Sequence, residues 1–320
     1  MLIKKIIFYL IYFIVLYITL CIFIVFLSFI GIQKNYTFKY EPFLSNQIYL
    51  YHKGLRNIWQ NNPSCVENIN SALKYVPKIG ACEFNNAEFR TQLNFTKNGR
   101  DQLNKITIKE SIAFLGDSVT MGWGVNDHQT FSNIVESDTK IKTYNLGVSS
   151  YGTYRELLRL KQNENFKDIK KIFIQYHRND IDENKYYLNI HKEENDKKVK
   201  LESANYNKKQ FIFKAIKKSI SNSYKYIFHI EKKKSLLNFT DHQYHLEKII
   251  NNFDLENKEI FIFYVNDSNR KFSNFPEGKL NNLTYFNIDL DKEDFYLIDD
   301  HPNPKGHKKI AEKIISIINM

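Results

Sequence analysis

The sequence predicts an α/β domain with a mainly parallel, five-stranded sheet covered by helices on both faces, preceded by one transmembrane helix. From residue 109 onward, short apolar runs alternate with segments of helical periodicity. Such alternation is typical of a parallel sheet with a helical layer on each face. The chain starts with a long segment almost free of charge, and its 320 residues are enough for one large domain.

Five apolar runs are the predicted strands: residues 111–115, 142–145, 171–176, 259–265 and 284–288. The predicted helices are residues 130–137, 154–163, 242–252 and 304–318. Residues 183–240 interrupt this rhythm, are rich in Lys, Asn and Tyr, and are predicted to be an insertion that covers the site. Because ligands bind beyond the carboxyl ends of parallel strands, the functional residues are expected at that edge of the sheet.

Residues 6–32 carry no charge and are long enough to cross a hydrocarbon core of roughly 30 Å as a helix. A cleavable signal peptide has a shorter apolar core and a small-residue cleavage site, so a retained anchor is favoured. Residues 1–5 form a short basic end that is expected to stay in the cytoplasm. The remaining chain is then expected in the periplasm or outside the cell.

The formal net charge is +11, and apolar residues make up 43% of the chain. The lysines are spread along the sequence and no nucleic-acid motif accompanies them, so no nucleic-acid partner is expected. A solvated, Lys-rich surface near anionic lipid is the expected role of this charge.

Residues 33–108 are predicted to form a membrane-proximal lead-in that packs on the domain of residues 109–320, with a short amphipathic helix at 51–63. The lead-in contains Cys65 and Cys82, the two cysteines outside the apolar segment. In an oxidising compartment they are candidates for a disulfide worth roughly 3 kcal/mol. The alternative is two separate buried thiols.

Polar residues follow three of the predicted strands, and Ser118 is the first of them. It ends a Gly-Asp-Ser triplet after strand 111–115 and precedes a helical turn. Free N–H groups and the dipole at a helix amino end favour developing negative charge, which suits a nucleophile. The alternative role for this serine is a helix N-cap.

The next two strands end near Gly147 and Asn179. A glycine lets the backbone approach a ligand closely and present its N–H, although glycine is also common in simple strand-to-helix turns. An asparagine just beyond a strand can offer its side-chain amide to an oxyanion, whereas an Asn-Asp pair also forms turns.

An acid and a histidine, Asp299 and His301, lie just before the last predicted helix. Asp299 can reach Nδ1–H of His301 and leave Nε2 free to face a serine. A metal site made of Asp299, Asp300, His301 and His307 is the alternative. It is disfavoured because His307 falls inside the last helix.

Four blocks, "GDSVT" at 116–120, Gly147, "HRND" at 177–180 and "DDHPN" at 299–303, resemble in this order the SGNH/GDSL hydrolase superfamily. The stretches "GDSVTMGWGV", "NLGVSSYGTYREL" and "HPNPKGHKKIAEKI" resemble a bacterial subgroup with one N-terminal membrane anchor. The resemblance covers roughly residues 80–320. It implies a flavodoxin-like three-layer α/β/α fold and ester cleavage by a Ser-His-Asp triad.

Carried over residue by residue, the resemblance implies Ser118 as nucleophile and His301 as base, with Asp299 orienting the imidazole. The N–H groups of Ser118 and Gly147 and the amide of Asn179 are then the oxyanion donors.

This chain departs from the family pattern in two places. His177 stands where the family usually has glycine, and its role is left open. The family often has its acid three residues before the histidine, where this chain has Ile298. Asp299 is therefore the expected triad acid, and the side chain of Asp300 is expected to point elsewhere.

The resulting prediction is a membrane-anchored serine esterase that hydrolyses O-acyl esters without a metal or organic cofactor. Its expected partners are an acyl ester, acylated carbohydrate among the candidates, and the lipid bilayer. Two alternatives stay open: an O-acyltransferase acting on a cell-surface glycan, and a non-catalytic anchored surface protein. The absence of a Gly-x-Ser-x-Gly elbow around Ser118 disfavours an α/β-hydrolase.

Overall fold

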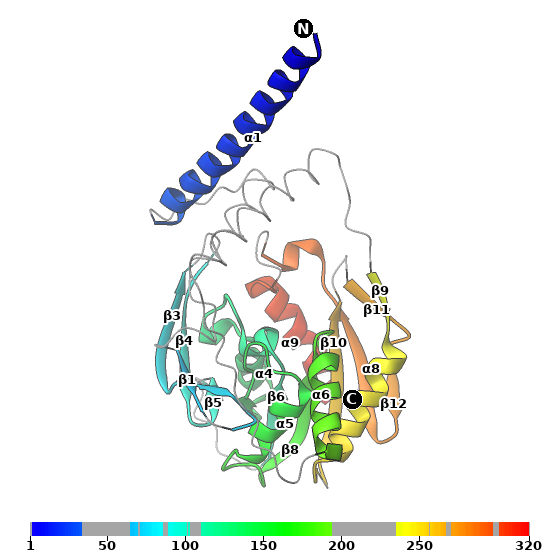
Figure 1. Cartoon of the computed structure of the whole chain (residues 1–320). Coiled ribbons are helices and arrows are strands. Elements are labelled where there is room, and N and C mark those ends of the chain that lie inside the picture. The colour runs from blue at the N-terminus through cyan, green and yellow to red at the C-terminus, as the bar shows by residue number, and fades with distance from the viewer. Residues whose placement is uncertain are drawn as a thin grey trace.

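The computed structural model describes residues 2–33, 65–69, 71–85, 89–100, 102, 110–193, 235–255, 257–266, 270–296 and 301–319. Helix α1 (Leu2–Gln33) contains the predicted apolar segment and stands apart from the folded body (Figure 1). Its stretch Ile3–Leu20 has a mean hydropathy of 2.0, and none of that stretch is buried. By length and composition this helix can cross a membrane, a property that signal sequences share.

Within the described residues, the main sheet has nine strands in the order β12-β13-β10-β8-β6-β7-β5-β4-β3. Its central strands are those predicted from the apolar runs: β6 (Ser111–Leu115), β7 (Lys142–Asn145), β8 (Ile169–Gln175), β10 (Glu259–Asn266) and β13 (Leu283–Asp289). Each neighbouring pair among these five strands is parallel. Their carboxyl ends therefore meet at one edge of the sheet.

Antiparallel strands extend the sheet on both sides, so the predicted five-stranded sheet is too small. They are β12 (Gly278–Leu280) beside β13, and β5 (Gly99–Arg100), β4 (Arg90–Thr96) and β3 (Gly80–Asn85) beyond β7. The last three come from the lead-in, where a two-residue turn, Lys97–Asn98, joins β4 to β5. The lead-in thus continues the sheet of the α/β domain.

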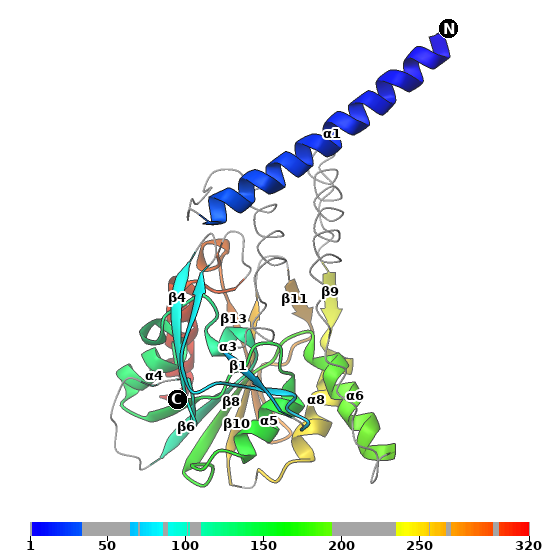
Figure 2. The same ribbon diagram turned by 60° about the vertical axis from the view of Figure 1, so that its left-hand side comes forward.

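Five helices flank the sheet: α4 (Phe131–Thr139), α5 (Thr153–Lys161), α6 (Asp180–Glu193), α8 (Phe239–Asn251) and α9 (Pro304–Ile318). Side chains of β6 alternate between the two faces. Ile112 and Phe114 share a core with α4 and α9, whereas Ala113 and Leu115 share one with α5, α6 and α8. The three layers are visible in Figure 2.

The lead-in also has a small core of its own beside the carboxyl edge of the sheet. Strands β1 (Val66–Asn68) and β2 (Tyr75–Pro77) pair antiparallel, and Cys65 is bonded to Cys82 with a Cα–Cα distance of 5.2 Å. This cluster includes Met121 and Val148 from the two loops that follow β6 and β7. The lead-in therefore packs directly against the loops in which function was predicted.

Only the ends of the predicted insertion are described. Helix α6 opens it, and β9 (Ser235–Asn238) near its close pairs parallel with β11 (Arg270–Ser273). The lead-in helix predicted at 51–63 and the boundary at 108 both lie outside the described residues.

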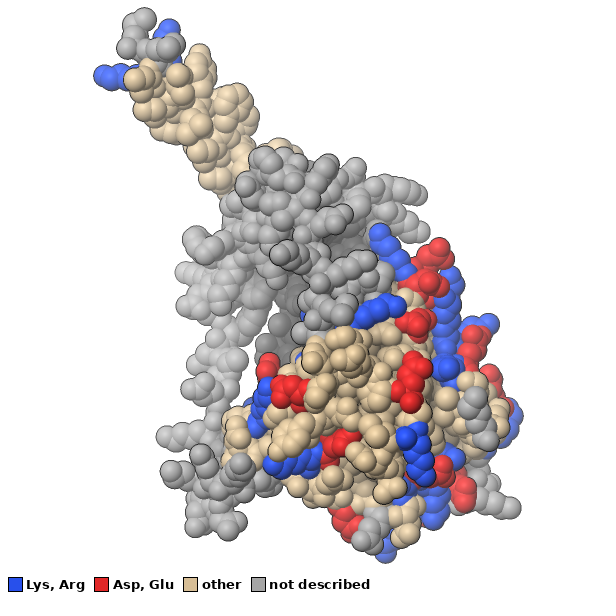
Figure 3. Space-filling model, turned by 90° about the vertical axis from the view of Figure 1, so that its right-hand side faces the viewer, with Lys and Arg blue, Asp and Glu red and all other residues tan. Residues whose placement is uncertain are grey.

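Acidic and basic side chains are interspersed on the face that Figure 3 shows. Ion pairs on the described surface include Lys185–Asp241 at 2.7 Å and Lys309–Asp291 at 2.7 Å. Such mixing matches the solvated, Lys-rich surface that the composition predicts.

Candidate active site

Ser118 is the first residue of the four-residue helix α3 (Ser118–Met121), which begins directly after β6. Gly116 makes this abrupt junction, with a φ of +152° and no room for a side chain, since a Cβ there would lie 2.2 Å from Thr120 Oγ1. The Asp117 carboxylate caps the helix by accepting the Val119 N–H at 3.0 Å. Asp117 therefore supplies the cap, which leaves the Ser118 hydroxyl available for other contacts.

Gly147 lies against this short helix. The neighbouring residues tie its loop to the end of β6, because Leu146 N–H donates to Phe114 O at 2.9 Å and Val148 N–H donates to Gly116 O at 3.1 Å. A Cβ on Gly147 would lie 2.4 Å from the Met121 nitrogen. The Gly147 N–H donates to Asn145 Oδ1 at 3.1 Å in this structure.

Asn179 lies in the turn between β8 and α6, and its side chain is exposed. Its Oδ1 is hydrogen-bonded to His177 Nδ1, so the NH₂ group is the part of the amide that can donate to a ligand. Asp180 closes the turn, because its Oδ2 accepts the His177 N–H at 3.1 Å while its own N–H donates to His177 O at 3.0 Å. His177 Nδ1 also lies 3.8 Å from Oδ2 of Asp117, the residue before Ser118.

His301 reaches Ser118 from the other end of the chain. Its Nε2 lies 2.7 Å from Ser118 Oγ, within hydrogen-bonding distance. The His301 carbonyl accepts the Tyr296 N–H at 3.0 Å, and the Phe295–Pro302 bridge closes the base of this loop. Asn303 then caps α9 by accepting from the Lys305 and Gly306 N–H groups. The histidine is thus fixed between a backbone bridge and a capped helix.

Asp299 and Asp300 lie outside the described residues, as does Ile298. His307, which the alternative metal site required, is fully buried, and its Nδ1 accepts the Phe131 N–H at 3.3 Å. Among the residues that the structure describes, no group of three or more His, Cys, Asp or Glu side chains is placed to hold a metal ion.

Two buried carboxylates, those of Glu156 and Asp180, lie near Asp117, the residue before Ser118, and no pattern in the sequence indicates them. Glu156 on α5 and Asp180 are fully or almost fully buried, and both Glu156 oxygens and Asp180 Oδ1 lack a hydrogen-bond partner. Burial raises the pKa of Glu156 well above its usual value, and the nearby charges of Asp180 and Asp117 act in the same direction. Burial likewise raises the pKa of Asp180, again with Asp117 adding to the effect.

An aromatic cluster borders His301. The Trp123 ring lies 6.2 Å from the His301 ring and 4.6 Å from Phe84, while Phe89 lies 5.0 Å from Tyr296. Phe84 and Phe89 come from the lead-in. The phenylalanines of the segment before residue 109 are the signal in the sequence that could have indicated that the lead-in contributes aromatic rings beside His301.

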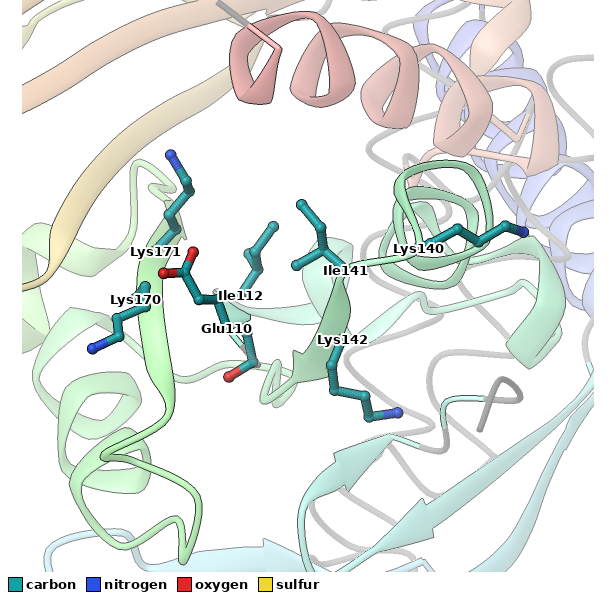
Figure 4. Close-up of a pocket in the computed structure, with 8 residues that line it drawn as sticks. Glu110, Ile112, Lys140, Ile141, Lys142, Lys170 and Lys171 are labelled. Atoms are coloured by element: carbon teal, nitrogen blue, oxygen red, sulfur yellow. The ribbon is translucent and has the colours of Figure 1, made fainter. Parts of the chain in front are cut away.

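A separate hollow of about 540 Å³ lies at the opposite, amino-terminal ends of the strands (Figure 4). Lys171 and Lys142 there are paired with Glu259 and Glu136 at 3.1 and 3.3 Å. Figure 4 shows the four lysine side chains pointing in different directions. These lysines do not converge on one anion, and they lie at the far edge of the sheet from Ser118.

No family model and no curated protein matches this chain. Solved structures similar to it include a G-D-S-L family protein from Desulfitobacterium hafniense, with 12% identity and a TM-score of 0.32 over 65% of this chain and 99% of that one. A GDSL-like lipase from Bacteroides thetaiotaomicron has 13% identity and a TM-score of 0.30 over 68% and 91%. A carbohydrate esterase family 2 enzyme from Corynascus thermopiles has 11% identity and a TM-score of 0.29 over 69% and 70%.

Proposed function

We propose that this chain is a membrane-anchored serine esterase of the SGNH/GDSL type that hydrolyses O-acyl esters. The 2.7 Å contact between Ser118 Oγ and His301 Nε2 carries the proposal. A serine at a helix amino end, hydrogen-bonded to an imidazole fixed by its own loop, is the arrangement that acyl transfer to serine requires.

In the proposed reaction His301 Nε2 accepts the Ser118 proton while Oγ attacks the acyl carbonyl. The carbonyl oxygen becomes an oxyanion, and its collapse breaks the ester bond while His301 gives the proton to the departing alcohol. Water, deprotonated by the same imidazole, then attacks the acyl-enzyme. The bond between the acyl carbon and Ser118 Oγ breaks, His301 returns the proton to Oγ, and the acid leaves. Asp299 is proposed to accept Nδ1–H of His301 and to stabilise the imidazolium.

The proposed oxyanion donors are the N–H groups of Ser118 and Gly147 and the NH₂ of Asn179. The hydrogen bond from His177 to Asn179 supports the third donor, because it occupies the amide oxygen and leaves the NH₂ group free to donate. For Gly147, the oxyanion has to displace or share the N–H that Asn145 Oδ1 accepts. His177, at the position where glycine is usual, would thus orient Asn179.

The arrangement of the chain supports the remaining parts of the proposal. The five parallel strands, numbered in chain order, lie in the order 2-1-3-4-5, which is that of a flavodoxin-like sheet. Helix α1 has the length and apolarity of a single membrane anchor. With its amino end in the cytoplasm, α1 would place the esterase domain in the periplasm or outside the cell, beside acylated carbohydrate of the envelope.

Labelling with a fluorophosphonate tests the proposal on the full chain in detergent. The wild type should label and release acid from a 4-nitrophenyl ester, whereas Ser118→Ala should do neither and His301→Ala should lose at least about 1000-fold in rate. Absence of labelling in the folded wild type would rule out the esterase and leave a non-catalytic surface protein.

Two additions sharpen this test. Asp299→Asn should slow the reaction strongly and Asp300→Asn only slightly, while the reverse order would move the acid assignment to Asp300. Including a sugar acceptor separates hydrolysis from transfer, because an acyltransferase would yield acylated sugar in place of free acid.

A further inference from the structure

Arg100, the last residue of β5 in the lead-in, is buried beneath the turn that follows the nucleophile helix. Its side chain is 0% exposed, and its Nε donates to Asp127 Oδ1 at 2.7 Å. Nη1 donates to Met121 O at 2.6 Å and Gly122 O at 2.7 Å, and Nη2 donates to Val125 O at 2.5 Å. One guanidinium thus fixes three backbone carbonyls of turn 121–125.

That turn is bonded directly to Ser118. The N–H groups of Gly122 and Trp123 both donate to the Ser118 carbonyl, at 3.1 and 2.9 Å. A four-residue helix has too few internal hydrogen bonds to be stable alone, and its last carbonyls need outside donors. Arg100 supplies such donors, so the position of Ser118 depends on the turn that Arg100 holds.

The same turn is bonded to the loop that carries His301. Tyr296 Oη donates to Gly124 O at 2.6 Å, and the Tyr296 N–H donates to His301 O at 3.0 Å. Phe89 packs against both Tyr296 and Gly124. Its ring centroid lies 5.0 Å from that of Tyr296, and its ring is so close to Gly124 that a Cβ there would lie 2.9 Å from it. Turn 121–125 therefore connects the nucleophile to the histidine.

The hydrogen bonds to Asp127 and to turn 121–125 require an arginine at position 100. Only a guanidinium offers five donors in a fixed planar fork, which here reaches a carboxylate and carbonyls on two sides. Gly122 leaves the necessary space, because a Cβ there would lie 2.5 Å from Arg100 Nη1. Asp127 compensates the buried charge and is itself held by Asn94 of β4, whose N–H donates to Asp127 Oδ1 at 3.3 Å.

We propose that Arg100 is a positioning residue for the esterase reaction and sets the separation between Ser118 Oγ and His301 Nε2 by fixing turn 121–125. The proposal rests on the proposed function, because it concerns the geometry of that reaction. It also implies that the lead-in, which contains Arg100, contributes to the geometry of the active site.

The test compares Arg100→Lys and Arg100→Met with wild type as full chains in detergent, at a temperature where circular dichroism shows each to be folded. The readouts are kcat and KM for a 4-nitrophenyl ester and the rate constant of fluorophosphonate labelling at Ser118. A misplacement of about 1 Å can cost roughly 100-fold. Both variants should lose about 10- to 100-fold in kcat and in labelling, with KM within about twofold, and Lys should retain more than Met.

Lys258 provides the matched control, because its Nζ donates to Phe166 O at 2.8 Å and Ile169 O at 2.7 Å at the amino-terminal edge of the sheet. Lys258→Met also removes a cation that is hydrogen-bonded to two backbone carbonyls, but far from Ser118. In this variant, Ser118 should be labelled at the wild-type rate. Folded Arg100 variants that label like wild type, or a Lys258→Met loss as large as theirs, would overturn the proposal.

If neither Arg100 variant folds, Tyr296→Phe tests the same turn. It removes the bond to Gly124 O from a half-buried ring and leaves the buried charge pair intact. Labelling should slow at least about fivefold, and an unchanged rate would overturn the proposal. A wild type that neither labels nor hydrolyses would instead refute the esterase itself, a failure visible before any variant is made.

Discussion

The pH dependence of unfolding gives a quantitative test of whether His307 is buried as a neutral ring in the core beside the candidate site. Its ring is fully buried at the start of α9 and stacks on Phe131, with the ring centroids 5.9 Å apart. Because Nδ1 accepts the Phe131 N–H, the native ring is neutral, with its proton on Nε2. Burial lowers the pKa of His307 from 6.5 to about 3, and Arg100 and His301 act in the same direction.

The direction in which stability changes with pH follows from whether the folded or the unfolded state binds the proton of His307. Below pH 6.5 the unfolded histidine becomes protonated, whereas the folded one stays neutral until about pH 3. The stability that His307 contributes is therefore complete above pH 6.5 and is lost as the pH falls. At about 1.4 kcal/mol per pH unit, the loss reaches about 2 kcal/mol at pH 5 and about 5 kcal/mol near pH 3.

Urea unfolding of wild type and His307→Gln at pH 7.5 and pH 5 measures this difference. Between these pH values wild type should lose about 2 kcal/mol more than the variant, because glutamine does not titrate. The same substitution at the exposed His128 is the control and should leave the pH dependence as in wild type. Equal pH dependence in wild type and His307→Gln would refute the assignment of a neutral, desolvated ring.

Two further substitutions probe the surroundings of Ser118. Gly147→Ala should lower the unfolding free energy by about 1–3 kcal/mol and reduce labelling of Ser118, because its Cβ would lie 2.4 Å from the Met121 nitrogen and displace helix α3. Urea unfolding and fluorophosphonate labelling measure the two effects, and a stable, fully reactive variant would contradict the prediction. Glu156→Gln should preserve activity and lose less stability than wild type as the pH rises above about 5, because a carboxyl whose pKa is raised by burial loses stability as the pH rises through that pKa. An equal loss in both proteins would show that Glu156 is not the titrating group.

The central sheet was predictable because parallel strands buried on both faces are continuous apolar runs. Strands β6 and β7 have the predicted bounds of 111–115 and 142–145, and helix α9 has the predicted bounds of 304–318. Proline at the first position and an asparagine cap mark the start of that helix in the sequence. The encounter of Ser118 and His301 followed from the rule that strand ends share one edge, combined with the family resemblance.

The contribution of the lead-in was not predictable in this way. Strands β3 to β5 lie in a stretch of the sequence that is rich in turn signals, and the pairing of β5 with β7 depends on a tertiary contact, Arg100 opposite Asn145. Arg100 itself makes most of its bonds to backbone carbonyls, which have no sequence signature. A buried arginine in a polar hairpin looks in sequence like any exposed one.

The raised pKa of Glu156 bears on the proposed chemistry as well as on stability. Glu156 is close enough to Asp117 for the two charges to interact, and Asp117 is the residue next to Ser118. An ionised Glu156 would place negative charge near the oxyanion of the proposed reaction, and in a site of low polarity that charge would raise the energy of the transition state. Burial raises the pKa of the Glu156 carboxyl and so favours its neutral form, while the guanidinium of Arg100 lies beneath turn 121–125 and is paired with Asp127. Glu156→Gln is therefore expected to retain activity, because glutamine is neutral at every pH, whereas Arg100→Met loses the hydrogen bonds that fix turn 121–125.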